Sequence, residues 1–212
     1  MRWKTGRRSS NIEDRRGQRR RVGAFKGGIG TVVIALALAY FLGIDPQVLL
    51  QMQRGVAPVT TEENYQPSPE EQQLAEFVSV VLADTEDTWN AIFRRSGLDY
   101  QEPVLVMFSG SVQSACGMAS AAVGPFYCPA DNKVYLDLSF FRDLKQRHGA
   151  PGDFAQAYVI AHEIGHHVQN LLGISKQVRS AQQGVGKADA NALSVKQELQ
   201  ADCFAGLWGN HA

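Results

Sequence analysis

The pentapeptide His162-Glu163-Ile164-Gly165-His166 combines two imidazoles and a carboxylate at a spacing that suits metal chemistry. Two histidines four residues apart on a helix lie only about 40° apart around its axis, so both can face one ion. Zinc takes imidazole nitrogens in a tetrahedral arrangement, and catalytic zinc keeps one position open for water. Glu163 stands where a carboxylate can accept a proton from that water. The pattern predicts one zinc ion on His162 and His166, with Glu163 as general base.

A further pair of acids lies downstream, in a segment whose apolar residues favour a helix. Glu198 and Asp202 are four residues apart and therefore share one helix face. The pair suits one carboxylate on the metal and a second that accepts the N–H of a ligating histidine. The alternative interpretation is an exposed acidic face on an amphipathic helix.

Several periodic segments must position these residues. A helix is expected to begin at Ser68-Pro69, with Ser68 as N-cap, and to end near Gly97. A second helix, capped by Asp153, carries the two histidines and reaches Gly173, and a third spans about 189–207. Apolar runs predict strands at 104–108 and 133–138. Turn residues 131–132 favour a hairpin in which 126–128 pairs with 133–138.

Charge and hydropathy divide the rest of the chain. Residues 1–26 hold ten of the 21 Lys and Arg but two of the 21 Asp and Glu, and predict a disordered, basic cytoplasmic arm. Residues 27–44 carry no charge and as a helix would span about 27 Å, which predicts a transmembrane anchor. Residues 45–67 read as a proline-containing linker, and 68–212 as the folded body. The positive-inside rule then predicts an exported body.

Other interpretations of these N-terminal segments stay open. The apolar run could be a buried core helix, although no polar face interrupts it, or a cleaved signal peptide with an unusually long basic region. The basic arm could bind nucleic acid, but it has few aromatic residues to stack on bases. Basic charge beside a membrane is the simpler account, so we expect a membrane partner and no nucleic acid.

The three cysteines fit export from the cytoplasm. Cys116 and Cys128 enclose a short loop rich in small residues and could form a disulfide in an oxidising compartment, which would leave Cys203 as a free thiol. Three buried thiols are the alternative. A zinc site made by cysteines is not expected, because no pair has the short spacing that such sites use.

Three motifs together carry a resemblance to a known family. The motifs that carry the resemblance are HEIGHHVQN, ELQADCFAG and the upstream GPFYCPADNKVYLDLSFF. Through them the chain resembles the neutral zinc metallopeptidase family, whose members are membrane-anchored bacterial proteins, and the likeness extends from the basic arm to Ala212. The Glu-x-x-x-Asp arrangement also resembles the gluzincins. The resemblance implies zinc ligands His162, His166 and Glu198, with Asp202 as the partner of a ligating histidine. It also implies that the chain is C-terminally truncated, since members of the family continue further.

The resemblance also sets expectations for fold, substrate and location. It implies an α+β, zincin-like domain, mainly helical with a small antiparallel sheet, in the bacterial inner membrane with its body outside the cytoplasm. Peptides or proteins would be the substrate, paired with an edge strand for which Val134, Tyr135 and Leu136 are the candidates. Two rivals stay open: an exported zinc-binding scaffold without catalysis, and an anchored structural protein without metal.

Other polar residues near the motif are assigned structural roles. His167 lies about 100° from His166 around the helix and is expected to hydrogen-bond or pack. His148 is expected to be exposed in a loop, and His211 to lie in a frayed chain end. Tyr127 and Tyr135 are candidates for a residue that steadies the transition state, although each is expected to be structural.

Overall fold

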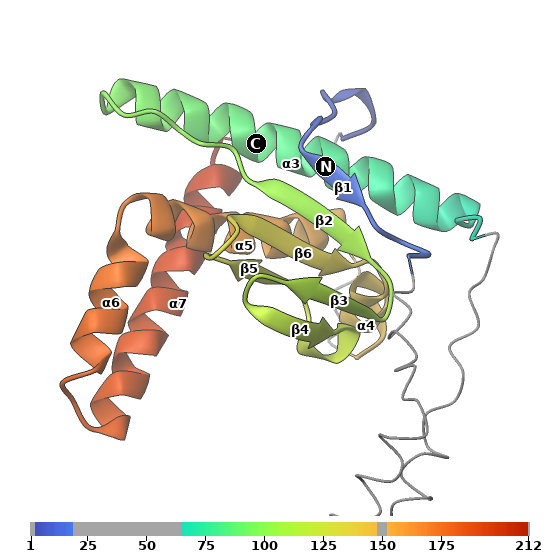
Figure 1. Ribbon diagram of the computed structural model, residues 1–212. Helices are drawn as coiled ribbons and strands as arrows, with labels where there is room; N and C mark the ends of the chain where they lie inside the picture. Colours follow the sequence, from blue (N-terminus) through green and yellow to red (C-terminus); the bar gives the residue numbers. More distant parts are fainter. Residues whose placement is uncertain (1–2, 19–64, 148–151, 212) are drawn as a thin grey trace, which may run out of the picture. The chain divides into compact units, whose positions relative to one another are not determined.

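The computed structural model describes residues 3–18, 65–147 and 152–211. These residues form one unit in which helices cover one side of a small four-stranded sheet and a two-stranded hairpin lies on the other (Figure 1). The expected α+β class with mainly helical content is confirmed. The predicted anchor, residues 27–44, and most of the linker lie outside the described residues. Among the helices that are described, none combines the length and apolar character that crossing a bilayer requires.

Helix α3, Pro69–Arg95, begins as the sequence predicts. The Ser68 side chain accepts the Glu71 N–H, and the Glu71 carboxylate accepts the Ser68 N–H, which completes a capping box. Its apolar stripe is fully buried at Val78, Val81 and Leu82. In Figure 1 this helix runs across the sheet, so its stripe forms one side of the core.

The sheet is mixed rather than antiparallel, which corrects the expected topology. Its strand order is β1 (Ile12–Asp14), β2 (Val104–Phe108), β6 (Lys133–Asp137) and β5 (Phe126–Cys128). β1 and β2 are parallel, as are β2 and β6, and only the β5–β6 hairpin is antiparallel. The chain returns from β2 to β6 through the antiparallel pair β3 (Ser111–Ser114) and β4 (Gly117–Ser120), the short turn η2 (Ala121–Val123) and β5.

Residues 3–18 belong to the folded unit, so the expectation of a disordered arm is wrong for them. They form the turn η1 (Trp3–Thr5) and strand β1. The Trp3 side chain is buried edge-on against Phe77, at 5.4 Å between ring centroids. Arg7 donates to Glu86 and Asp87 of α3, and Asn11 donates to Glu86 as well. Arg7 and Asn11 thus have partners in α3, which sequence composition does not reveal.

The pairing of strand β1 with strand β2 constrains how the chain could be arranged at a membrane. β1 and β2 are hydrogen-bonded neighbours, so residues 3–18 and the body must lie on the same side of any bilayer. A cytoplasmic arm combined with an exported body does not fit this pairing, and the location of the folded unit stays a prediction. The segment is also held by charge pairs: Arg7 and Arg8 pair with acids of α3, and Lys133 of β6 pairs with Glu13.

The predicted disulfide is present between Cys116 and Cys128, whose Cα atoms lie 5.8 Å apart. It joins the turn between β3 and β4 to the end of β5. Cys203 is a free, exposed thiol, also as predicted. The bridge therefore constrains the edge strand of the main sheet.

Four helices follow the sheet. α4 spans Ser139–Arg147, α5 Asp153–Leu171, α6 Ile174–Gln182 and α7 Lys187–Gly209. α5 packs between the sheet and α7, and α6 and α7 stand side by side (Figure 1). At Gly165 a side-chain carbon would lie 2.8 Å from the Ala201 carbonyl oxygen, so only glycine permits this close crossing of α5 and α7. The crossing brings the two acids of α7 to the two histidines of α5.

Candidate metal centre

The side chains of His162, His166 and Glu198 converge where α5 crosses α7. One potential ligand atom from each lies within 4.8 Å of the others. The Nε2 atoms of both histidines are 3.2 Å from the same Glu198 carboxylate oxygen, Oε2. Two imidazole nitrogens and one carboxylate oxygen match the donor set of a catalytic zinc site. Among the described residues, no other group of His, Cys, Asp and Glu forms such a cluster.

Each histidine is oriented through its second ring nitrogen. His162 Nδ1 lies 2.8 Å from Asp202 Oδ1, which places Asp202 where the sequence predicted a partner for a ligating histidine. Asp202 also accepts a hydrogen bond from the Tyr158 hydroxyl at 2.9 Å. His166 Nδ1 lies 3.0 Å from the side-chain oxygen of Gln169. Both Nε2 atoms are thereby left to face Glu198, as metal ligation requires.

Gln169 is the orienting residue that sequence reasoning missed. It is fully buried, and its amide nitrogen donates to the Gln197 carbonyl oxygen at 2.7 Å and to Gln200 Oε1 at 3.0 Å. The signal was available, because Gln169 follows His166 by three residues and so shares its helix face. Tyr158 precedes His162 by four residues and could have been found in the same way.

His162, His166 and Glu198 are together called the metal group. Glu163 is buried beside them, with 8% of its surface exposed. The pKa of its carboxyl is raised to about 7, chiefly by burial and also by the nearby Glu198 carboxylate, while His166 and a hydrogen bond from the Tyr127 backbone act in the opposite direction. A carboxyl group with such a pKa can both accept and release a proton near neutral pH.

The strand predicted to pair with substrate is not available for that role. Val134, Tyr135 and Leu136 of β6 are each 1% exposed, and β6 lies between β2 and β5 with both edges hydrogen-bonded. The prediction is therefore wrong, because an apolar strand pattern does not show whether a strand is central or at an edge. The edge strand on this side of the sheet is β5.

His167 anchors β5 to the helix and does not face the metal group. It is 1% exposed, its Nε2 lies 2.6 Å from the Gln101 carbonyl oxygen, and its Nδ1 lies 3.1 Å from the Tyr127 hydroxyl. Burial lowers the pKa of the His167 imidazole. Asn170 also donates to the Tyr127 hydroxyl, at 3.1 Å. The expected packing and hydrogen-bonding role of His167 is confirmed.

The other tyrosine and histidine residues considered in the sequence do not belong to the metal group, or lie outside the described residues. Tyr135 donates its hydroxyl hydrogen bond to Asp131, 2.7 Å away, in the β5–β6 hairpin. His211 is exposed near the end of α7, and His148 is not among the described residues.

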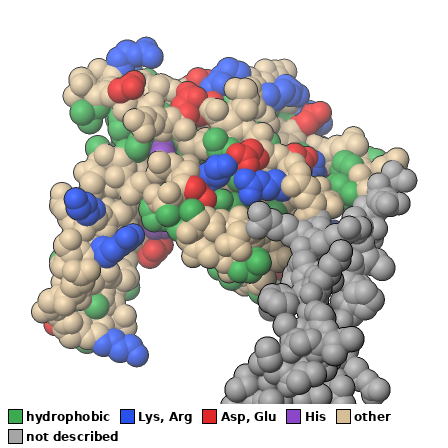
Figure 2. Space-filling view, viewed as in Figure 1, with side chains coloured by type: hydrophobic (Ala, Val, Ile, Leu, Met, Phe, Trp, Pro, Cys, Tyr) green, Lys and Arg blue, Asp and Glu red, His purple; other side chains and the backbone are tan. Residues whose placement is uncertain are grey.

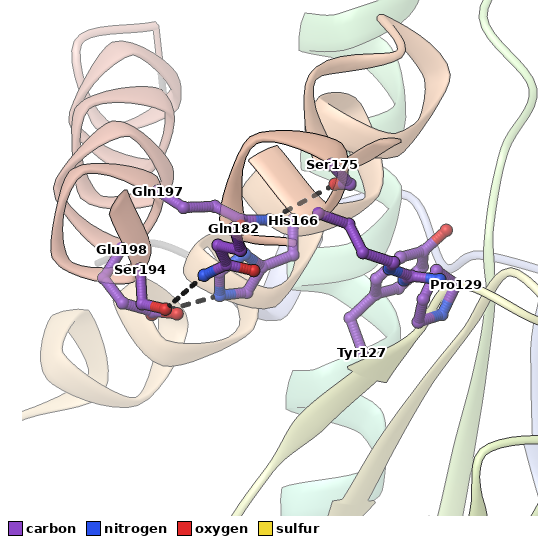
Figure 3. Close-up of a pocket in the computed structure, with 9 residues that line it drawn as sticks. Tyr127, Pro129, His166, Ser175, Gln182, Ser194, Gln197 and Glu198 are labelled. Atoms are coloured by element: carbon purple, nitrogen blue, oxygen red, sulfur yellow. Dashed lines mark hydrogen bonds and ion pairs between the residues drawn. The ribbon is translucent and has the colours of Figure 1, made fainter. Parts of the chain in front are cut away.

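A polar cavity of about 340 Å³ opens beside the metal group, between β5 and helices α5, α6 and α7. Figure 3 shows His166 and Glu198 directed toward each other at this cavity, with Tyr127 and Pro129 on the far side of His166. Arg179, Gln182 and Ser194 also line it. The cavity gives a ligand access to the metal group from solvent.

Comparison with known proteins agrees with this geometry. The whole chain, residues 1–212, matches the family model described as "Putative neutral zinc metallopeptidase". No solved structure matches the chain. The family's name implies zinc, and the three side chains described above are suitable ligands for it.

Several relatives share much of the sequence. The chain is 48% identical over 220 aligned residues to "Uncharacterized protein YpfJ" of Escherichia coli K12, covering 99% of this chain and 75% of the relative. It is 39% identical over 181 residues to "Uncharacterized protein Rv2575" of Mycobacterium tuberculosis H37Rv, covering 82% of this chain and 59% of the relative. Neither name assigns a reaction. On the match of its full length, the chain belongs to the neutral zinc metallopeptidase family.

Proposed function

We propose that this protein hydrolyses peptide bonds with one zinc ion held by His162, His166 and Glu198. The observation that carries the proposal is the convergence of these three ligand atoms beside a buried carboxyl, with both histidine Nδ1 atoms already hydrogen-bonded. Zinc bound there would supply Lewis-acid chemistry, polarising an oxygen that it binds. A structural site closes with a fourth protein ligand, whereas the described residues supply three.

Glu163 is the proton carrier in this proposal. Its carboxylate accepts a proton from the water that attacks the peptide carbonyl, and the resulting acid returns that proton to the leaving amine. Burial suits the residue to both steps by raising its pKa to about 7. Asp202 and Gln169 hold the two imidazoles in one orientation, so the ligands need little rearrangement during turnover.

A bound peptide would meet the sheet at β5. This strand is at the edge, and its Tyr127 lines the cavity beside His166. The Tyr127 backbone N–H already donates to Glu163, so an extended peptide would pair with the remaining backbone groups of this edge strand. β5 therefore replaces β6 as the substrate-pairing strand.

The substitution Glu163→Gln tests the reaction directly. It keeps the size of the side chain but cannot accept a proton, so we expect cleavage of fluorescently labelled casein to fall at least a hundredfold, within the usual range for general bases. Zinc content measured by mass spectrometry should stay at one per chain. Glu70→Gln, on an exposed residue of α3, is the matched control and should keep full activity. Full activity in Glu163→Gln with zinc bound would refute the mechanism.

We further propose that the whole folded unit, including residues 3–18, lies outside the cytoplasm of a bacterium, next to its membrane. The disulfide supports an oxidising compartment. The exposed thiol of Cys203 provides a native reporter, which a membrane-impermeant maleimide should label in intact spheroplasts. Lys4→Cys in a Cys203→Ser background should react in the same way, since Lys4 is exposed on the same unit. Labelling of either thiol only after lysis would contradict this location.

A further inference from the structure

The cavity beside the metal group contains one basic side chain, Arg179 of α6. It shares the cavity with two of the three metal-ligand candidates, His166 and Glu198. Figure 2 shows basic side chains on the part of the surface formed by α6 and α7. Arg179 therefore lines the same cavity that opens beside the metal group.

The neighbouring polar side chains of the cavity wall already have partners. The Gln182 amide donates to the Ala190 carbonyl oxygen at 3.1 Å and to Ser194 Oγ at 2.8 Å. The Gln197 amide donates to Ser175 Oγ at 3.3 Å, and Figure 3 shows that these bonds connect α6 to α7. They hold the wall in place and occupy donors that could otherwise bind a substrate.

Arg179 differs from these neighbours. Across the described ranges no carboxylate lies within ion-pair distance of its guanidinium group, and its side chain makes no hydrogen bond to another described residue. Its five N–H donors match the geometry of a carboxylate. Glu198 is the one acidic residue lining the cavity, and in the proposed function its carboxylate is committed to zinc. The cavity is then positive overall and favours an anionic group.

We propose that Arg179 binds a carboxylate of the peptide substrate and so selects peptides with a negative charge close to the cleaved bond. This inference rests on the proposed function, because it assigns the substrate class of the same site. An aspartate or glutamate side chain and the C-terminal carboxylate offer the same chemistry. Bidentate pairing with either would orient the peptide across the cavity, beside β5.

The test measures binding as well as cleavage. The Glu163→Gln protein, loaded with zinc, is titrated with two pairs of fluorescent, N-acetylated pentapeptides. One pair differs only in a free or amidated C-terminus, and the other, amidated, differs only in a central glutamate or glutamine. We expect the charged member of at least one pair to bind about tenfold more tightly, on the scale of a charge-assisted hydrogen bond. The pair that shows the preference identifies the source of the carboxylate.

Variants then assign the preference to one residue. In the Glu163→Gln background, Arg179→Gln should reduce the preference to less than twofold and leave the affinity for uncharged peptides unchanged. Lys176→Gln removes an equal charge from an exposed residue of the same helix that does not line the cavity, and should keep the preference. A preference that survives Arg179→Gln, or its absence from both peptide pairs, would overturn the proposal.

Cleavage by the zinc-loaded native protein separates the two proposals. Binding discrimination that depends on Arg179, without cleavage of any of the four peptides or of casein, supports the subsite and contradicts the peptidase. Cleavage of charged and uncharged peptides with equal kcat/KM and equal affinity supports the peptidase and contradicts the subsite.

Discussion

The two histidines of the metal group lie one helical turn apart but are held in different ways. His162 is oriented by Asp202, a half-exposed carboxylate on another helix, which Tyr158 also contacts. His166 is oriented by Gln169, a fully buried amide on its own helix. A carboxylate makes a ligating imidazole more basic, whereas an amide fixes its orientation without adding charge. The basicity of the His162 imidazole is therefore set by a neighbouring charge, whereas the orientation of the His166 imidazole is set by a packed, uncharged amide.

Burial explains why the second partner is an amide. Gln169 must accept from His166 Nδ1 and donate to two oxygen atoms, those of Gln197 and Gln200. Among side chains of this length only an amide offers both an acceptor and two donors. A carboxylate here would face two acceptors without solvent to screen it. Asp202 meets no such restriction, because 44% of its side chain is exposed.

The largest effect should follow from Gln169→Glu. The substitution removes two donated hydrogen bonds and places a charge against two oxygen atoms, so the free energy of unfolding of the metal-free protein should fall by about 3 kcal/mol. Urea denaturation followed by circular dichroism measures this change. Gln177→Glu, on an exposed residue of α6, is the control and should change stability by less than about 0.5 kcal/mol. Equal stability of Gln169→Glu and the native protein would remove the distinction drawn between the two partners.

Asp202→Asn should affect the metal more than the fold. The asparagine can still accept a hydrogen bond from His162, but it no longer stabilises the imidazole electrostatically, so zinc affinity should fall about tenfold. Competition with a chromogenic chelator measures the dissociation constant. Asp189→Asn, an exposed residue in the first turn of α7, should leave it unchanged. A loss of folding stability comparable to that of Gln169→Glu would show that both partners act by packing.

The smallest effect should come from Tyr158→Phe. It removes one hydrogen bond to Asp202 while leaving the bond from His162 intact, so zinc affinity should fall about threefold. Tyr100→Phe is the matched control, because the buried Tyr100 hydroxyl has no hydrogen-bond partner among the described residues. That variant should bind zinc as the native protein does. Identical affinities for both variants would mean that Tyr158 does not help to orient Asp202.

Much of the metal centre could be predicted because it depends on helical spacing. His162 and His166 share a face of α5 through local geometry alone, and the same spacing placed Glu198 and Asp202 together on α7. The close crossing at Gly165 also follows from a local feature, the absence of a side chain. These predictions needed no knowledge of how distant segments pair.

The sheet was harder to predict because strand pairing is not local. β1 is three residues long, too short to show a periodic pattern, and its basic surroundings suggested an unfolded arm. Its pairing with β2 adds a strand to the edge of the sheet and places residues 3–18 in the same folded unit as the body. β6 lies inside the sheet because it pairs with β2 on one side and β5 on the other, and Tyr135 on this strand is buried rather than open to a peptide.

The central claim is that one zinc ion is bound by His162, His166 and Glu198. X-ray absorption at the zinc edge of the loaded protein tests it most directly, because nitrogen and oxygen ligands at about 2.0–2.1 Å are distinguished from sulfur at about 2.3 Å. We predict one zinc per chain with two imidazole ligands, further oxygen ligands and no sulfur. A sulfur ligand from Cys203, or the same spectrum after Glu198→Ala, would contradict the assigned site.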